Sequence, residues 1–192
     1  IGDKIDYIGN LKGVSAPLEI DAHHKYVTPG FIDSHSHADS LVKTKPEQIE
    51  KVEQGITTNI AGQCGGSVCG KDAAEFLDAY RGAKLGSNMA LLIGHGTLRR
   101  AVLGTSSREP NAEELEQMKS MMRDAMEHGA LGVSFGLIYA PGCFGKTGEL
   151  IEIAKVVGEY HGIAAIHLRS EAVQLVAAVR EFITIVKESG VR

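Results

Sequence analysis

Two histidines separated by one residue, His35 and His37, are the most informative chemical feature of the sequence. The apolar pair Phe31-Ile32 before them predicts a short buried strand that ends near the histidines. In an extended segment, residues i and i+2 lie on the same side, so both imidazoles can bind one metal ion. Ligating histidines need acceptors for their ring N–H groups, and we expect Asp33 and Asp39 to supply them. The competing interpretation is a pair of histidines that only form hydrogen bonds at a strand end.

Cys64 and His167 stand at equivalent positions, after two other apolar runs. A thiolate beside imidazoles favours zinc over magnesium or calcium. Without a metal, Cys64 would be a small buried residue and His167 a hydrogen-bonded histidine at a strand end. Arg169 and Glu171 either orient His167 or pair with each other, and we favour a structural role for both. His95 follows a further predicted strand. Its position suits a residue of the active site, but its flanking glycines equally suit a tight turn.

The glycine-rich loop around Cys64 allows two other interpretations. Gly65-x4-Gly70-Lys71 is similar to a phosphate-binding loop between a strand and a helix. Asp72 stands where a hydroxyl would hold Mg²⁺, and its carboxylate would repel phosphate, which argues against nucleotide binding. Cys64 and Cys69 could instead form half of a zinc knuckle, but the sequence nearby offers no second ligand pair.

The apolar runs predict an alternation of buried strands and helices, which is typical of parallel sheets covered on both faces. We predict strands over 30–33, 56–61, 88–93, 130–134 and 163–166. We predict helices over 45–54, 72–81, 111–128, 147–161 and 171–189. Five βα units indicate an α/β fold, either a doubly wound sheet or a (β/α)8 barrel, whose strand ends would form the active site. Residues 1–28 alternate apolar and polar positions and predict hairpin strands of a small antiparallel sheet.

Composition excludes several classes of function. The 192 residues are 43% hydrophobic and carry a formal net charge of −4, which is not basic enough for nucleic-acid binding. No apolar run approaches the roughly 20 residues of a membrane span. No signal peptide precedes the first strand, so we expect a cytoplasmic protein that does not bind membranes. Three cysteines argue for free or metal-bound thiols over a disulfide framework.

The ends of the chain bear on its completeness. It begins at Ile1, and it stops at Arg192, where a helix has ended and another strand should begin. Five strands do not close an eight-stranded barrel. We therefore expect either a complete open sheet or the first part of a longer polypeptide.

The segment from Val27 to His37, Val-Thr-Pro-Gly-Phe-Ile-Asp-Ser-His-Ser-His, resembles the first-strand signature of the amidohydrolase superfamily. More narrowly, five segments in order resemble the N-acyl-D-amino-acid deacylases, or D-aminoacylases. These segments are Gly55-Ile-Thr-Thr, Gln63-Cys-Gly, Gly94-His-Gly-Thr-Leu-Arg, Gly129-Ala-Leu-Gly-Val-Ser-Phe-Gly-Leu-Ile-Tyr-Ala-Pro-Gly and His167-Leu-Arg-Ser-Glu. The resemblance implies that 1–28 is part of a small β-sandwich and that 29–192 is the first portion of a (β/α)8 TIM barrel.

The resemblance also implies roles for particular residues. The implied ligands of one or two zinc ions are His35, His37, Cys64 and His167. Many relatives bridge two metals with a carbamylated lysine on the fourth strand. The predicted fourth strand here has no lysine, so Cys64 is the more consistent bridging ligand. His95 and Tyr139 are expected near the substrate.

The activity that the resemblance implies is hydrolysis of the acyl amide of an N-acyl-D-amino acid to a carboxylate and a D-amino acid. Zinc would polarise the amide carbonyl and activate a water. The aspartate that acts as general base would lie beyond Arg192, with the carboxy-terminal half of the barrel, so we expect these 192 residues alone to be inactive. A cyclic-amide hydrolase of the hydantoinase or dihydroorotase type is the alternative, and a non-catalytic metal-binding scaffold is the third possibility.

Overall fold

A five-stranded parallel sheet forms the centre of the computed structural model, which describes residues 4–10, 12–70 and 72–192. The strands are β1 (Phe31–Asp33), β2 (Ile56–Ala61), β3 (Asn88–Gly94), β4 (Gly132–Gly136) and β5 (Ile163–His167). Each strand pairs in parallel with its neighbour in the sequence. A doubly wound sheet would reverse its strand order at a switch point. The uninterrupted order instead makes the sheet part of a (β/α)8 barrel.

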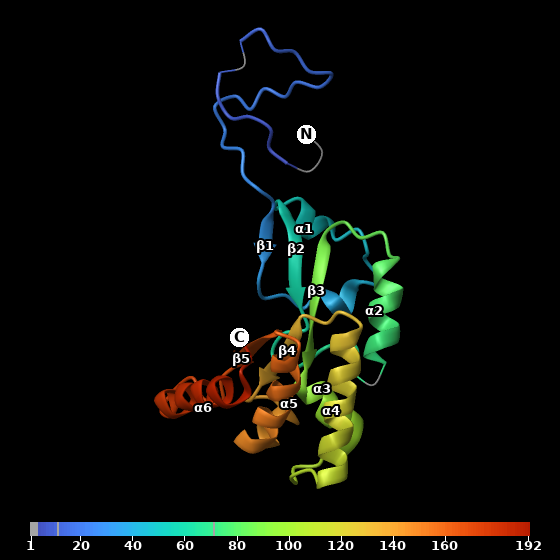
Figure 1. The fold of residues 1–192 in the computed structure, drawn as a ribbon, viewed down its shortest axis with the longest axis vertical. Coiled ribbons are helices and arrows are strands. Elements are labelled where there is room, and N and C mark those ends of the chain that lie inside the picture. The colour runs from blue at the N-terminus through green and yellow to red at the C-terminus, as the bar shows by residue number, and fades with distance from the viewer. Residues whose placement is uncertain (1–3, 11, 71) are drawn as a thin grey trace.

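Helices connect the strands and cover the outside of the sheet (Figure 1). They are α1 (Ile49–Val52), α2 (Ala73–Arg81), α3 (His95–Leu103), α4 (Ala112–Glu127), α5 (Thr147–Glu159) and α6 (Leu175–Ser189). Two short 3-10 turns, η1 (Ala38–Leu41) and η2 (Gly142–Phe144), lie in the loops that follow β1 and β4. Successive helices α4, α5 and α6 pack side by side. Because all five strands run parallel, their carboxyl ends lie at the same edge of the sheet.

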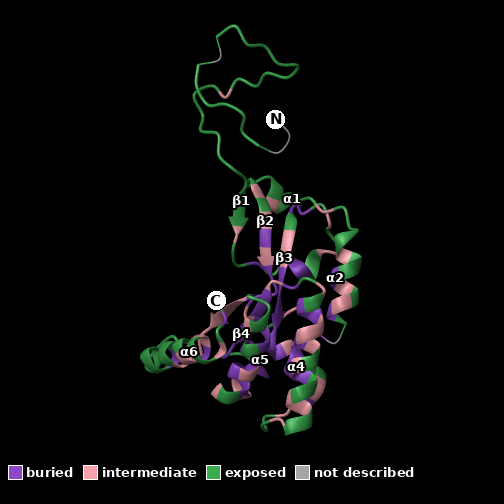
Figure 2. Ribbon diagram, in the orientation of Figure 1, coloured by how far each residue is buried: buried purple, intermediate pink, exposed green. Residues whose placement is uncertain are grey.

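The hydrophobic core lies between the sheet and helices α4 and α5, where Figure 2 shows most of the buried residues. Val133 and Phe135 of β4 pack among Met118 and Met122 of α4 and Leu150 of α5, all fully buried. Burial of each side chain of this size stabilises the fold by roughly 1.5–3 kcal/mol. This packing fixes β4 and the loop that follows it relative to the neighbouring strands.

The five predicted strands are confirmed, with bounds that shift by at most two residues. The predicted helix over 45–54 is shorter, and that over 171–189 begins only at Leu175. The sequence does not predict helix α3, because the glycines beside His95 suggest a tight turn. In the structure, Gly94 has extended backbone angles and serves as the N-cap of a helix that starts at His95.

The amino-terminal segment differs from its prediction. Residues 4–10 and 12–30 form no helix or strand in the structure and are almost entirely exposed. The predicted hairpin strands are therefore not formed in these residues, and Figure 1 shows the segment extending away from the sheet. The assignment of 1–28 to a β-sandwich stays a prediction. Lys71, the lysine of the possible phosphate loop, lies outside the described residues.

A membrane span requires a helix that is both long and apolar. None of the helices in the described part of the chain is long enough and apolar enough to cross a bilayer.

Candidate metal centre

His35, His37 and Cys64 come together at the carboxyl ends of β1 and β2. One ligand atom from each residue lies within 4.8 Å of the others. The Sγ atom of Cys64 is 3.2 Å from Nε2 of His35, and the two imidazole centroids are 5.8 Å apart. Two imidazoles and a thiol within reach of a single ion match the donor types that zinc prefers. The structure thus brings three of the four predicted ligands into one cluster.

Close contact between backbones holds Cys64 in this cluster. Cys64 has a φ of 55° and Gly65 a φ of 73°, both in the left-handed region. A Cβ atom on Gly65 would lie 2.5 Å from the backbone nitrogen of Gly136, at the end of β4. The Ser134 hydroxyl accepts a 3.0 Å hydrogen bond from the Gly65 N–H. Strained backbone of this kind persists only where the surrounding contacts over-determine it.

The two aspartates beside the cluster hold backbone instead of imidazole rings. Asp39 is buried, and its carboxylate accepts hydrogen bonds from the N–H groups of Gly62 and Val68, which shape the loop around Cys64. Asp33 accepts a 3.2 Å hydrogen bond from the His35 backbone N–H and pairs with Lys51. The hydrogen bond from Lys51 lowers the pKa of Asp33. The prediction that these carboxylates bind the ring N–H groups is therefore wrong for this structure, because the backbone and Lys51 occupy them.

His167 lies at the end of β5 and outside the three-residue cluster. Its Nδ1 atom is 3.4 Å from the Tyr139 hydroxyl, and the two rings meet edge to face at 4.9 Å. Its Nε2 atom is 3.4 Å from a carboxylate oxygen of Glu171. Burial, and then the charge of the Glu171 carboxylate, raise the pKa of the Cys64 thiol. Tyr139 lines the same pocket as His37 and Cys64, so its contact with His167 connects that histidine to the cluster.

His95 is placed differently from the expectation that it lies near the substrate. Its side chain is 0% exposed, and its Nε2 atom is 2.7 Å from Oε1 of Glu149 on α5. Arg99 donates to the other oxygen of the same carboxylate. Burial lowers the pKa of His95, and because the Glu149 carboxylate can only accept, Nε2 is the donor in this hydrogen bond. His95 therefore lies beneath the surface of the site.

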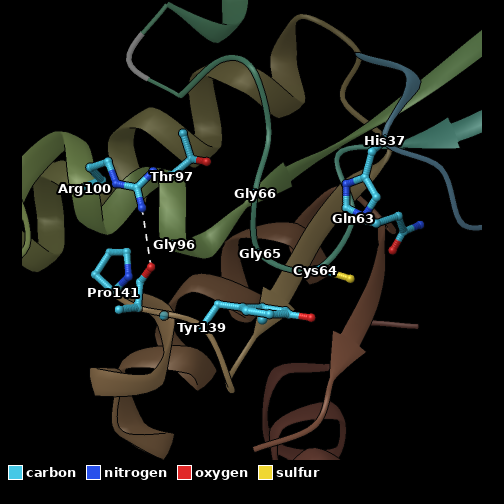
Figure 3. Close-up of a pocket in the computed structure, with 13 residues that line it drawn as sticks. His37, Gln63, Cys64, Gly65, Gly66, Gly96, Thr97, Arg100, Tyr139 and Pro141 are labelled. Carbon is cyan, nitrogen blue, oxygen red and sulfur yellow. Dashed lines mark hydrogen bonds between the residues drawn. The ribbon is translucent and has the colours of Figure 1, made fainter. Parts of the chain in front are cut away.

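A pocket of about 310 Å³ opens beside the cluster (Figure 3). His37 and Cys64 border one end, and Arg100 and Pro141 border the other. Tyr139 lies between them, half exposed. The pocket and the cluster therefore form one continuous site at the carboxyl ends of the strands, where barrel enzymes bind their substrates.

Comparison with known proteins agrees with this geometry. The family model described as Amidohydrolase family matches residues 18–177. The chain belongs to the amidohydrolase family. It is 34% identical to D-aminoacylase of Alcaligenes xylosoxydans xylosoxydans over 99% of this chain and 44% of the relative. N-acyl-D-glutamate deacylase of the same organism is 32% identical, over 98% of this chain and 43% of the relative.

Solved structures of similar proteins agree with these sequence matches. N-acyl-D-glutamate deacylase of Bordetella bronchiseptica, complexed with zinc and a phosphonate inhibitor, aligns with a TM-score of 0.80 and 34% identity. That match covers 85% of this amidohydrolase chain and 39% of the solved one. L-hydantoinase of Arthrobacter aurescens is 21% identical with a TM-score of 0.67, which shows a shared fold alone. The amidohydrolase chain spans less than half the length of the relatives that it matches.

Sequence reasoning misses the contacts of two residues that support the amidohydrolase site. One is Glu149, whose position within a helix gives no sign that it lies under the site. The other is Arg169, for which we favour a structural role, but with His167 or Glu171 as its expected partner. Arg169 instead pairs with Glu181 at 2.9 Å and donates to the carbonyls of Cys143 and Gly145 at 2.7 and 2.8 Å. It thereby holds the loop after β4, which carries Tyr139.

Proposed function

We propose that this chain is part of a zinc-dependent amidohydrolase that hydrolyses the acyl amide bond of N-acyl-D-amino acids. The observation that carries the proposal is the cluster of His35, His37 and Cys64 in a chain 34% identical to D-aminoacylase. Deacylases of D-amino acids recur among its relatives, including one named for N-acyl-D-aspartate. The likeness to a hydantoinase extends only to the fold, so the cyclic-amide alternative has less support.

The donor set fits a zinc ion. The two imidazoles and the thiol belong to the ligand types of zinc sites, and their donor atoms lie within 4.8 Å of one another without rearrangement of the backbone. His35, His37 and Cys64 would hold the metal, and His167 would join them as a further ligand. A bound zinc would supply a Lewis acid that polarises an amide carbonyl.

The remaining residues of the site would bind and orient the substrate. Tyr139 is half exposed beside the pocket, and its hydroxyl is only weakly engaged at 3.4 Å from His167, so it can donate to a substrate oxygen. Arg169 would keep Tyr139 in place by holding the carbonyls of its loop. His95 would support the substrate site indirectly, because its ring lies against Gly145 of the same loop. The cytoplasmic location and the general-base aspartate beyond Arg192 stay predictions.

Enzymatic assay of the complete polypeptide that carries this chain tests the proposal. The zinc-loaded protein is given N-acetyl-D-leucine, N-acetyl-L-leucine and dihydroorotate, before and after treatment with a chelator. We expect turnover of the D-amide, loss of turnover after chelation, and recovery on addition of zinc. Turnover of dihydroorotate instead would favour the cyclic-amide hydrolase. Bound zinc without turnover of any amide would favour the scaffold.

A further inference from the structure

The pocket beside the metal cluster has an unequal distribution of charge. None of its described lining residues is an aspartate or a glutamate, whereas Arg100 contributes a guanidinium at the end away from Cys64 (Figure 3). The first turn of α3 also borders the pocket, through Gly96 and Thr97. The amino terminus of a helix carries a partial positive charge. The Thr97 N–H of this turn already donates to the Gly65 carbonyl, so the charge that favours an anion at this end of the pocket is chiefly that of Arg100.

Arg100 is free to bind such an anion. The only side-chain hydrogen bond of Arg100 among the described residues is a long one of 3.4 Å from Nη2 to the carbonyl of Ala140. No described carboxylate lies within ion-pair distance of it. The adjacent Arg99, by contrast, is fully buried and paired with Glu149. The two neighbouring arginines thus differ in role, since one stabilises the fold and the other faces the pocket with its charge unneutralised.

We propose that Arg100 recognises a carboxylate on the part of the substrate that enters this pocket, so that the enzyme prefers substrates with a second carboxylate. This inference rests on the proposed function and specifies its substrate class. The carboxylate belongs either to the side chain of the amino acid or to the end of the acyl group, and Arg100 would bind both in the same way. Guanidinium groups bind carboxylates through paired hydrogen bonds, which neutral side chains cannot reproduce.

Steady-state kinetics on the complete polypeptide test the proposal with three substrates. N-acetyl-D-glutamate carries the carboxylate on the side chain, N-succinyl-D-leucine carries it on the acyl group, and N-acetyl-D-leucine has no second carboxylate. The variants are Arg100→Gln and Arg100→Lys, with Arg180→Gln as a control for loss of an exposed arginine on α6. Binding of glutarate, a dicarboxylate without an amide, is measured by calorimetry on the same proteins.

We expect Arg100→Gln to lower kcat/KM about 10- to 100-fold for at least one dicarboxylic substrate, as loss of a charged hydrogen bond does. N-acetyl-D-leucine should be affected less than about threefold, Arg100→Lys should be intermediate, and Arg180→Gln should match wild type. The substrate that responds identifies the source of the carboxylate. Equal losses for all three substrates, or no loss, would overturn the proposal.

The glutarate measurement separates this proposal from the proposed function. If wild type turns over none of the substrates, the deacylase function fails. Glutarate binding that Arg100→Gln abolishes would then still support the carboxylate pocket. Absence of glutarate binding to an inactive wild-type protein would overturn both.

Discussion

His95 and Glu149 form a buried hydrogen bond of 2.7 Å that joins the start of α3 to α5 against Gly145 of the loop after β4. Burial alone would raise the pKa of Glu149, but the hydrogen bonds from His95 and Arg99 outweigh it and hold that pKa below its ordinary value. The carboxylate is therefore ionised, and it neutralises an arginine that is completely buried. His95 and Arg99 therefore both depend on the Glu149 side chain for their buried hydrogen bonds.

Replacement of Glu149 should consequently be strongly destabilising. Glu149→Gln leaves Arg99 buried without a counter-charge, and removal of one partner from a buried ion pair costs about 3–5 kcal/mol. Glu152→Gln, on the same helix, breaks only surface pairs with Lys119 and Lys155 and should cost less than about 1 kcal/mol. The free energies of unfolding in urea measure the difference. Equal stability of the two variants would contradict the structural role of Glu149.

Loss of the Cys64 thiol should weaken zinc binding. Cys64→Ser removes a soft ligand, so zinc affinity should fall by more than the roughly 10- to 100-fold that loss of a supporting residue costs. Cys143→Ala is the matched control, because Cys143 contacts Arg169 through its backbone carbonyl, which the substitution retains. Competition with a chromophoric zinc chelator measures both affinities. Similar affinities for the two variants would remove Cys64 from the site.

A methyl group on Gly65 should disturb the same site through the backbone. Gly65→Ala places an L side chain at a φ of 73°, which costs about 1–2 kcal/mol, and its Cβ meets the backbone of Gly136. Gly148→Ala is the control, because a methyl group at this position near the start of α5 would have nothing within 4 Å. We expect Gly65→Ala to lower both stability and zinc affinity, and Gly148→Ala to change neither by more than about 1 kcal/mol. Unchanged zinc binding in Gly65→Ala would show that the loop can adapt.

The start of α4 should make stability depend on acid pH. Glu114 accepts a 2.9 Å hydrogen bond from the Asn111 N–H, and its own N–H donates to the Asn111 side chain. Hydrogen bonds from Arg108 and from Asn111 lower the pKa of Glu114 to about 2. Because the folded pKa lies below the unfolded one, this stabilisation is complete above the unfolded pKa and is lost as the pH falls toward about 2.

Glu114→Gln should therefore flatten the decrease in stability between neutral and acid pH, while Asn111→Ala should cost about 0.5–2 kcal/mol at neutral pH. Glu113→Gln leaves both hydrogen bonds of the capping box intact and serves as the control. Urea unfolding at several pH values measures these effects. An unaltered pH dependence in Glu114→Gln would show that other carboxylates account for it.

The sequence predicts the parts of the fold in which local pattern and tertiary environment agree. The run from Ile56 to Ala61 is rich in β-branched residues and followed by glycine, and it forms a strand over those residues. Helix α3 escapes prediction because the glycines beside His95 suggest a turn, and because its buried face includes His95 and Arg99, whose partner Glu149 is some 50 residues away in the sequence. Local periodicity cannot identify a polar residue that is buried only through a distant ion pair.

The candidate site is also predictable where local pattern is sufficient and unpredictable where distant contacts decide. The spacing of His35 and His37 and the position of Cys64 after the next strand are sufficient to predict their proximity. The sequence does not predict the hydrogen bonds that the Asp39 carboxylate accepts from the N–H groups of Gly62 and Val68. These bonds depend on the path of a loop that only the folded chain defines. The pocket likewise depends on how the first turn of α3 meets the loop of Pro141.

The backbone contact between Gly65 and Gly136 divides the site into a part that tolerates redesign and a part that does not. Any side chain at these two glycines would push apart the loops that carry Cys64 and Tyr139. Thr97 is tied to the same loop, because its N–H donates to the Gly65 carbonyl and its hydroxyl bonds the backbone of Ser67. The side chain of Arg100 has only a long hydrogen bond, to the carbonyl of Ala140, among the described residues. A combinatorial library for altered substrate range should therefore vary Arg100 and leave the two glycines and Thr97 constant.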